Sequence, residues 1–327
     1  MEATDAIIVT GATGFVGRYL VDYLTKAGEK VIATGRSRKY DAFFDQLGVP
    51  FLPLDIRDPD SFAVLPVGPV KAFIHLAAVI PAAVKDVTSD VFLRTNTLGT
   101  FYALEHCRRN GIRKFLYTST RFEVSEHTEV PISEAMGRKY ALTGDHASYV
   151  ISKVAAAEYV EHYSQDYGIQ GIIQPLTGLL GYGRQEGFWA QGVFHPSAFE
   201  IHYARVKAGK PLEIWGSHET RRDSLYVKDA VRAIYMAILS DYAHGVYLIG
   251  SGVGRTNEDE VLTFARVFGT SEMPLPVVYR PELPEEPKSY VFDISKAKRD
   301  FGWEPVFDYA SILVDYDVEV QSGKFKT

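Results

Sequence analysis

The chain has 327 residues, of which 46% are apolar and 23% are charged, and its formal net charge is −6. An acidic balance argues against a protein that binds the phosphate backbone of nucleic acids, because such a protein needs a basic face. No apolar run approaches the roughly 20 residues of a membrane span, and the single cysteine, Cys107, cannot form an internal disulfide. We therefore expect a cytoplasmic protein that binds neither nucleic acid nor membrane.

The first half of the chain repeats one pattern, in which a short apolar run precedes a helical pattern. The runs are rich in Ile, Val and Phe, as expected for strands buried on both faces. They span residues 6–11, 30–35, 49–55, 71–78, 114–120 and 168–175. Helical periodicity is clear at 18–28 and 96–111. Strands that alternate with helices predict right-handed crossovers and a Rossmann-like, doubly wound parallel α/β sheet.

After residue 175 the sequence becomes irregular and rich in Gly and aromatic residues, which predicts a loop-rich segment. Further elements are expected in the order helix, strand, helix, strand and helix, at 198–208, 212–216, 227–240, 245–250 and 295–301. We assign 1–175 and about 225–250 to a dinucleotide-binding domain, and 176–224 and 251–327 to a smaller, mixed α/β substrate lobe. The lobe is expected to close over the carboxyl ends of the strands, where ligands bind in open sheets.

The turn after the first predicted strand, "TGATGFVG" (10–17), predicts a binding site for a dinucleotide. Gly11 permits a tight turn, Gly14 lets a pyrophosphate approach the backbone, and Gly17 lets the helix pack closely on the strand. The helix then presents free N–H groups and the positive end of its dipole to the phosphates. The expected cofactor contacts in this turn are Gly11, Thr13, Gly14, Phe15, Val16 and Gly17.

The end of the second strand indicates which dinucleotide is bound. An acidic residue there would bind the ribose hydroxyls of NAD, but the chain has Gly35 followed by Arg36, Ser37 and Arg38. A guanidinium binds a 2′-phosphate through charge-assisted hydrogen bonds, so NADP(H) is preferred and NAD(H) is the alternative. A solvated basic turn would explain the same residues. Asp55 and Ile56, after the third strand, are expected to meet the adenine.

In "SYVISK" (148–153), Tyr149 and Lys153 lie four positions apart on an expected helix. That spacing brings both side chains to one face. By itself it also describes two ordinary neighbours on a half-exposed helix.

Taken in order, these motifs resemble an extended short-chain dehydrogenase/reductase of the type that modifies nucleotide-diphosphate sugars. The resemblance rests on the cofactor turn, Tyr149 and Lys153, and six further segments: "HLAA" (75–78), "NTLGT" (96–100), "TST" (118–120), "KAGKPLEIWGSHETRRDSLYVKDAVRAI" (207–234), "GVYLIGSG" (245–252) and "DISKAKRDFGWEP" (293–305). It implies that Tyr149 exchanges a proton with the reacting C–O group and that Lys153 holds the nicotinamide ribose. The ammonium of Lys153 is expected to lower the pKa of the phenol toward the working pH. Thr120, with Ser119 as the alternative, is expected to bind the same oxygen.

The resemblance also implies further contacts. For the cofactor these are Leu76, Ala77, Ala78, Asn96, Thr118 and Pro175. For the substrate they are Thr177, Arg222, which would grip the diphosphate, and Arg280 as a second clamp. A surface ion pair with Asp223 or Asp229 would explain Arg222 equally well, and Asp229 resembles a structural residue at a helix start.

Three stretches depart from the family pattern. After Thr120 the dehydratase members carry an Asp-Glu pair, whereas this chain has Arg121 and Phe122, and Glu123 could reach the site only through a shifted loop. Thr177 stands near the place of a substrate-binding asparagine. The stretch before Tyr149, residues 135–147, is unlike the usual Pro-rich approach and is a candidate for specificity.

We expect a 4-ketoreductase that uses NADPH to reduce a nucleotide-diphosphate-4-keto-6-deoxyhexose. The alternative is a 4-epimerase with the same Tyr149, Lys153 and Thr120. A 4,6-dehydratase, a reductase of small ketones and a dinucleotide sensor without turnover are weaker hypotheses. No histidine pattern has the spacing of a metal site, and a homodimer through the helices that hold 96–110 and 149–165 is expected.

Overall fold

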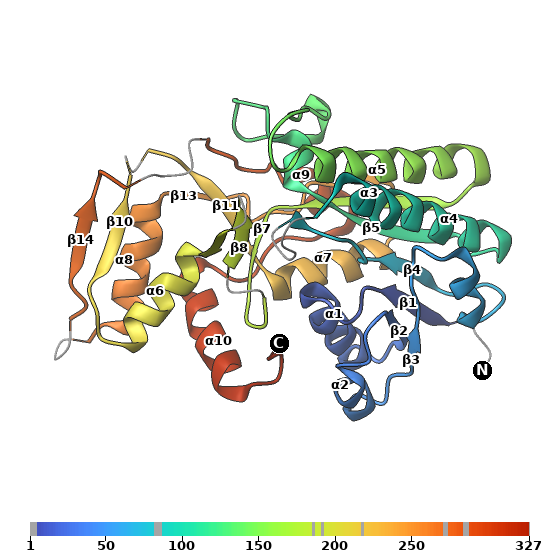
Figure 1. The fold of residues 1–327 in the computed structure, drawn as a ribbon, viewed down its shortest axis with the longest axis horizontal. Coiled ribbons are helices and arrows are strands. Elements are labelled where there is room, and N and C mark those ends of the chain that lie inside the picture. Colours follow the sequence, from blue (N-terminus) through green and yellow to red (C-terminus); the bar gives the residue numbers. More distant parts are fainter. Residues whose placement is uncertain are drawn as a thin grey trace.

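The computed structural model describes residues 5–81, 87–184, 187–190, 193–216, 219–270, 274–283 and 288–326. Figure 1 shows a larger lobe around a twisted sheet on the right and a smaller lobe on the left. Among the described residues, no helix is long and apolar enough to span a membrane.

The larger lobe is built on a sheet of seven parallel strands in the order β12-β6-β5-β4-β1-β2-β3. The strands are β1 (Ala6–Thr10), β2 (Lys30–Gly35), β3 (Phe51–Pro53), β4 (Ala72–His75), β5 (Lys114–Thr120), β6 (Gln170–Leu176) and β12 (Gly245–Val246). All six runs predicted in the first half therefore form strands. The order reverses between β1 and β4, which is where ligands bind in doubly wound folds.

Helices cover both faces of this sheet because successive strand residues point to opposite sides. Ile7 and Val9 join one hydrophobic cluster, and Ile8 joins another. The first cluster packs against α1 (Phe15–Lys26), α2 (Asp41–Gln46) and α7 (Val227–Leu239), and the second against α4 (Gly99–Arg109) and α5 (Ala147–Tyr167). The strands must therefore be apolar throughout.

The smaller lobe has its own hydrophobic cluster, which includes Leu212, Phe264 and Leu313. The cluster lies among α6 (Ala198–Lys207), α8 (Asn257–Phe268), α10 (Tyr309–Ser322) and the parallel pair β10 (Leu212–Trp215) and β14 (Val277–Arg280). A three-stranded sheet of β7 (Gly178–Leu180), β11 (Arg222–Tyr226) and β13 (Gly254–Arg255) lies in the middle of the molecule between this pair and the large sheet (Figure 1).

The structure adds elements that the sequence did not predict. The segment expected to be loop-rich contains β7 and the antiparallel hairpin β8 (Gly187–Ala190) and β9 (Val193–Pro196). Helices α8 and α10 were also not predicted. After α9 (Ser295–Phe301), Trp303 and Phe325 are buried in the first cluster of the large sheet, so the end of the chain packs against both lobes.

Short helical segments complete the description: 3₁₀ helices Pro59–Val64, Arg121–Val124 and Glu134–Met136, helix α3 (Ser89–Phe92) and a π-helical segment Leu93–Leu98 that leads into α4.

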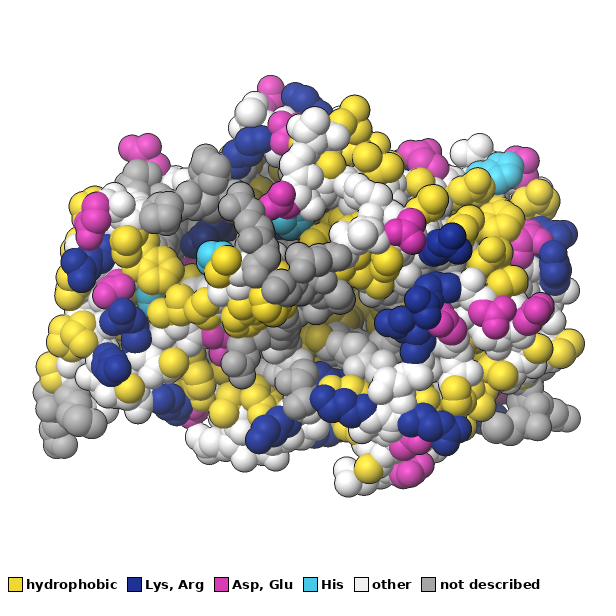
Figure 2. Space-filling view, in the orientation of Figure 1, with side chains coloured by type: hydrophobic (Ala, Val, Ile, Leu, Met, Phe, Trp, Pro, Cys, Tyr) yellow, Lys and Arg dark blue, Asp and Glu magenta, His cyan; other side chains and the backbone are white. Residues whose placement is uncertain are grey.

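Figure 2 shows hydrophobic side chains gathered over α4 and α5.

Candidate active site

The turn between β1 and α1 has the shape that a bound pyrophosphate needs. Gly11 has φ +72°, and a Cβ on it would lie 2.7 Å from the Ala77 backbone nitrogen. A Cβ on Gly17 would lie 2.2 Å from the Gly11 carbonyl oxygen. Gly14 is the N-cap of the helix and no side chain caps it, so among the described residues the N–H groups of Phe15 and Val16 have no protein acceptor. Glycines at these positions therefore fit a dinucleotide.

The basic turn after β2 lies beside this cradle. A Cβ on Gly35 would lie 2.9 Å from Thr13 Oγ1, so the two turns are in close contact. Arg36 is exposed and, within the described part of the chain, has neither an ion-pair nor a hydrogen-bond partner. Arg38 lies 3.5 Å from Asp41, and Ser37 Oγ accepts a hydrogen bond from the Lys39 backbone at 3.2 Å. Arg36 is therefore the arginine of this turn without a carboxylate within ion-pair distance in the described structure, and its charge lowers the pKa of Asp55.

At the expected adenine end, the Asp55 carboxylate is bound to Arg57, whose Nε and Nη2 donate to it at 2.9 and 2.5 Å. The hydrogen bonds from Arg57 lower the pKa of Asp55. Ile56 is buried, and its Cδ1 would lie 2.7 Å from a Cβ on Gly99. The side chain of Ile56 thus packs inward, which leaves only its backbone for a ligand.

Asn96 lies in the π-helical segment and fastens the loop after β4 to α5. Its Oδ1 accepts from the Val79 backbone at 2.8 Å, and its Nδ2 donates to the Val79 carbonyl and to Ser152 Oγ, each at 3.0 Å. Leu76, Ala77 and Ala78 are half-buried at the start of this loop. Asn96 therefore positions Ser152, the residue before Lys153. The side-chain oxygen and nitrogen of Asn96 already have protein partners.

The catalytic candidates gather at the carboxyl end of β5 and the first turns of α5. The buried Tyr149 hydroxyl shares a hydrogen bond with Thr120. Lys153 Nζ donates to the Thr118 carbonyl at 2.7 Å and lies 4.2 Å from the centre of the Tyr117 ring. Pro175 lies opposite Ser119 on the neighbouring strand β6. The structure thus brings the predicted Tyr, Lys and Thr together at the ligand-binding edge of the sheet.

The pKa values of the pair differ from the expectation. Burial raises the pKa of Tyr149 to about 12, against the opposing effects of the Thr120 hydrogen bond and the Arg121 charge. Burial lowers the pKa of Lys153 to about 7, opposed by the charge of Glu123. The prediction that Lys153 lowers the pKa of the phenol is therefore wrong for the protein without a cofactor. Burial disfavours the charged form of both groups.

Glu123 is a member of this cluster that the sequence did not place. It is 1% exposed, accepts a hydrogen bond from Ser119 Oγ at 2.5 Å and lies 3.8 Å from Arg138 Nε. Burial raises the pKa of its carboxyl group. Ser119 therefore faces Glu123, whereas Thr120 faces Tyr149. Arg138, which also binds Glu158 and Glu161 at 2.5 and 2.6 Å, carried no sequence signal.

The substrate candidates lie on the elements that join the two lobes. Thr177 is buried, and its hydroxyl donates to the Asp223 carbonyl at 2.7 Å. Arg222 lies 3.7 Å from Glu260, and its Nε is buried without a partner in the described structure. The ion pair expected as the alternative role of Arg222, with Asp223 or with Asp229, is not formed in the described structure, because both carboxylates have other partners. Asp223 accepts from Ser251, Gly252 and Phe292, and Asp229 accepts from Val306, Phe307 and Arg232. The structural role expected for Asp229 is confirmed.

Arg280 ends β14, which lies at the outer edge of the smaller lobe (Figure 1). It is half-exposed and lies 4.0 Å from Glu213 and 3.6 Å from Glu282. The structure therefore gives Arg280 two carboxylate neighbours, and its role as a phosphate clamp stays a prediction.

The sequence model of the NAD dependent epimerase/dehydratase family matches residues 7–250. A UDP-glucose 4-epimerase of Mycolicibacterium smegmatis is 28% identical over 307 residues, covering 91% of this chain and 93% of that protein. A dTDP-4-dehydro-6-deoxyglucose reductase of Escherichia coli is 22% identical over 312 residues, covering 92% and 93%. The crystal structure of the UDP-N-acetylglucosamine 4-epimerase from Bacillus cereus matches with a TM-score of 0.78 at 21% identity over 97% of both chains, a likeness that concerns the fold.

Proposed function

Because the chain belongs to the NAD dependent epimerase/dehydratase family, we propose that it is an NADPH-dependent 4-ketoreductase of a nucleotide-diphosphate-4-keto-6-deoxyhexose. The single observation that carries the proposal is the cluster of Tyr149, Thr120 and Lys153 at the edge of the sheet that also holds the glycine turn. A nucleotide-sugar substrate agrees with the names of the relatives and with Arg222, whose buried Nε has no partner among the described residues.

NADPH would supply a hydride to the carbonyl carbon, and the glycine turn, Arg36 and Lys153 are the residues that would hold it. Tyr149 donates a proton to the carbonyl oxygen as charge develops there, and Thr120 orients the hydroxyl through their shared hydrogen bond. Since burial raises the pKa of Tyr149 to about 12, the phenol is protonated at neutral pH. That is the form a proton donor needs.

The preference for NADP(H) over NAD(H) rests on Arg36, the free guanidinium of the turn after β2. A site that prefers NADP(H) favours net reduction over epimerisation. A reductase must exchange its cofactor at every turnover, whereas an epimerase regenerates the cofactor that it already holds. NAD(H) remains the alternative cofactor.

The second candidate function is 4-epimerisation of a nucleotide-diphosphate sugar, which would use the same residues. The similarity to a UDP-glucose 4-epimerase over most of both chains favours it. Arg121 and Phe122 speak against 4,6-dehydration, because they stand where the dehydratases carry their Asp-Glu pair and Glu123 alone supplies only one carboxyl group in this segment. A homodimer through α4 and α5 also belongs to the proposal, since Ile151 and Tyr159 are 43% and 40% exposed on α5.

Incubation of the purified protein with NADPH and a dTDP-4-keto-6-deoxyhexose tests the proposal. We expect the nicotinamide absorbance to fall by one equivalent per sugar reduced. A sugar that changes configuration at C4 without net loss of NADPH would establish the epimerase instead. A protein that turns over neither keto nor hydroxy nucleotide sugars would contradict both functions.

A further inference from the structure

A cavity of about 290 Å³ lies beside the catalytic cluster, and the reaction proposed above leaves it without a role. Three segments enclose it: residues 121–127 after β5, the stretch 141–147 that leads into α5, and residues 288–292. Ala147 and Val150 line it from α5, on either side of Tyr149 in the sequence. Phe122, which also lines the cavity, packs against the hydrophobic cluster that contains Tyr149, so the cavity lies close to Tyr149 although Tyr149 does not itself line it.

Arg121 lines this cavity, and its guanidinium contacts two aromatic rings. The guanidinium carbon lies 4.2 Å from the centre of the Phe122 ring and 4.2 Å from the centre of the Tyr290 ring. His146 stacks on Phe122 with ring centres 4.7 Å apart. Two such cation–π contacts restrain the guanidinium, while its N–H groups stay available as hydrogen-bond donors.

Among the residues that the structure describes, no protein acceptor takes up those donors. Within the described residues, Arg121 has no carboxylate within ion-pair distance and no hydrogen-bond partner, and none of its nitrogens is buried and unsatisfied. Arg138, by contrast, has three glutamates, and Arg222 has Glu260. Arg121 is therefore a fixed, open site for an acceptor with two oxygens.

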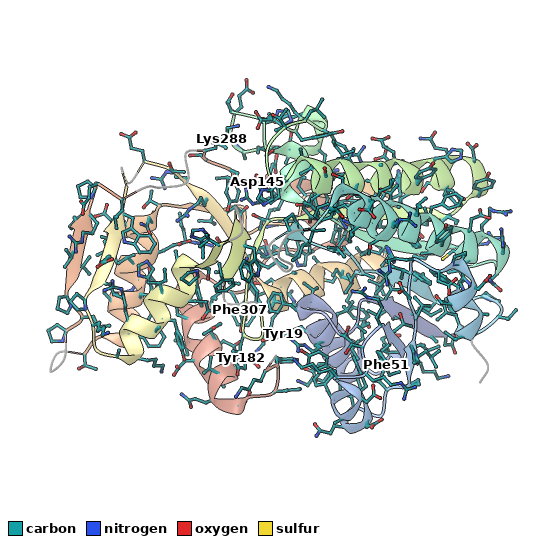
Figure 3. All side chains as sticks on the ribbon, in the orientation of Figure 1. Tyr19, Phe51, Asp145, Tyr182, Lys288 and Phe307 are labelled. Atoms are coloured by element: carbon teal, nitrogen blue, oxygen red, sulfur yellow. The ribbon has the colours of Figure 1, made fainter. Side chains whose placement is uncertain are left out.

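Other charged groups around the cavity leave Arg121 as its main positive charge. Lys288 is bound to Glu126 at 2.8 Å, and one nitrogen of His127 is bound to the Gly137 carbonyl at 2.9 Å. Asp145 is exposed to solvent, which screens its charge. Figure 3 labels Asp145 and Lys288, which come from two different segments of the cavity lining. The charge of Arg121 also reaches the reacting hydroxyl, because it lowers the pKa of Tyr149.

We propose that this cavity is a subsite for a carboxylate on the sugar and that Arg121 binds the carboxylate edge-on through two N–H donors. The substrate class is thereby a nucleotide-diphosphate sugar with an acidic substituent. A carboxyl-bearing group attached to a ring oxygen is compatible with a 6-deoxyhexose, whereas a carboxyl group at C6 would take the place of its methyl group. The inference rests on the proposed function, since it assumes that a nucleotide sugar lies against Tyr149.

Binding to the protein saturated with NADP⁺ tests the inference without turnover. The probes are three pairs, each with a neutral and an acidic member: UDP-glucose and UDP-glucuronic acid, UDP-N-acetylglucosamine and UDP-N-acetylmuramic acid, and GDP-mannose and GDP-mannuronic acid. Isothermal titration is expected to show about tenfold tighter binding of the acidic member in at least one pair, which is the strength of one good charge-assisted contact. Arg121→Met should abolish that preference and leave the Kd of the neutral member unchanged.

Arg121→Lys keeps the charge without the planar fork, so it should retain only part of the preference. Arg299→Met, which removes an exposed arginine on α9 bound to Asp300 at 2.8 Å, is the matched control and should retain all of it. Equal binding of both members in every pair, or a preference that survives Arg121→Met, would overturn the carboxylate subsite while leaving the proposed function intact. If none of the six nucleotide sugars binds, this inference fails, whereas the proposed function is still tested separately by reduction of the dTDP-4-keto-6-deoxyhexose.

Discussion

Replacing Lys153 with methionine should make the cofactor-free protein more stable at neutral pH while removing its activity. The side chain is 3% exposed, and burial lowers its pKa from the ordinary value of 10.5 to about 7. Each unit of pKa is worth about 1.4 kcal/mol, so carrying the charged form into the folded state costs about 5 kcal/mol. Methionine has a similar length and no charge, but it loses the hydrogen bond to Thr118, which contributes about 1 kcal/mol.

The difference in the free energy of unfolding between the variant and the wild-type protein depends on pH, and the direction of this dependence follows from the protons that each state binds. The unfolded chain holds the lysine proton up to about pH 10.5, whereas the folded protein releases it above about pH 7. Between these values the unfolded state binds more protons, so the stability of the wild-type protein rises with pH relative to that of the variant. The variant should be more stable by about 3 kcal/mol at pH 7, and this advantage should vanish near pH 10.

The measurement is denaturant unfolding of both proteins from pH 6 to pH 10, with tryptophan fluorescence and circular dichroism required to give one transition. Other titrating groups are common to both proteins and cancel in the difference. Lys30→Met is the control, because the Lys30 side chain is 71% exposed, and its effect should not change with pH. A Lys153→Met protein that is less stable at pH 7, or a difference that is constant across the range, would refute the reasoning.

Four further predictions concern single residues of the turn, the site and the dimer. Gly17→Ala should lower the free energy of unfolding by about 3 kcal/mol and weaken cofactor binding, because its Cβ would lie 2.2 Å from a backbone oxygen; unaltered urea unfolding would contradict this. Arg36→Ala should weaken NADP(H) about tenfold in titration calorimetry and leave NAD(H) nearly unchanged, since only the 2′-phosphate needs the guanidinium; equal losses for both would exclude the phosphate contact. Tyr149→Phe should reduce kcat at least about a hundredfold at unchanged cofactor Kd, because the proton donor is gone, and full turnover would remove Tyr149 from the mechanism. Tyr159→Glu should convert a dimer into a monomer in light scattering by placing a charge in the α4–α5 interface, whereas a wild-type monomer would exclude that interface.

The large sheet was predictable because its inner strands β1, β2, β4, β5 and β6 are largely buried on both faces and are therefore mostly apolar. The runs at 30–35 and 114–120 match β2 and β5 residue for residue. The strand expected at 245–250 shrinks to Gly245–Val246, since only these two residues pair in register with β6, and a single bridge from Ile249 follows. Local pattern predicts burial, but it does not predict how long two strands stay in register.

The features that were missed depend on contacts between distant residues. Helix α8 starts at a capping box in which Thr256 and Asp259 exchange hydrogen bonds, a signal that the sequence contained. By contrast, the burial of Glu123 depends on Arg138, 15 positions further on, and on Glu158 and Glu161 beyond it. The prediction for the pKa of Tyr149 failed because it counted the charge of Lys153 and omitted the burial that the fold imposes on both groups.

The short helix Arg121–Val124 brings two residues of opposite charge type, Arg121 and Glu123, near Tyr149. Arg121 lowers the pKa of Tyr149, whereas the buried Glu123 raises the pKa of both Tyr149 and Lys153. These residues follow Thr120 directly, so the segment that orients the phenol through Thr120 also sets the charge around it. The departure from the family pattern at residues 121–123 therefore lies where it can change both the acidity of Tyr149 and the charge of the sugar that Tyr149 meets.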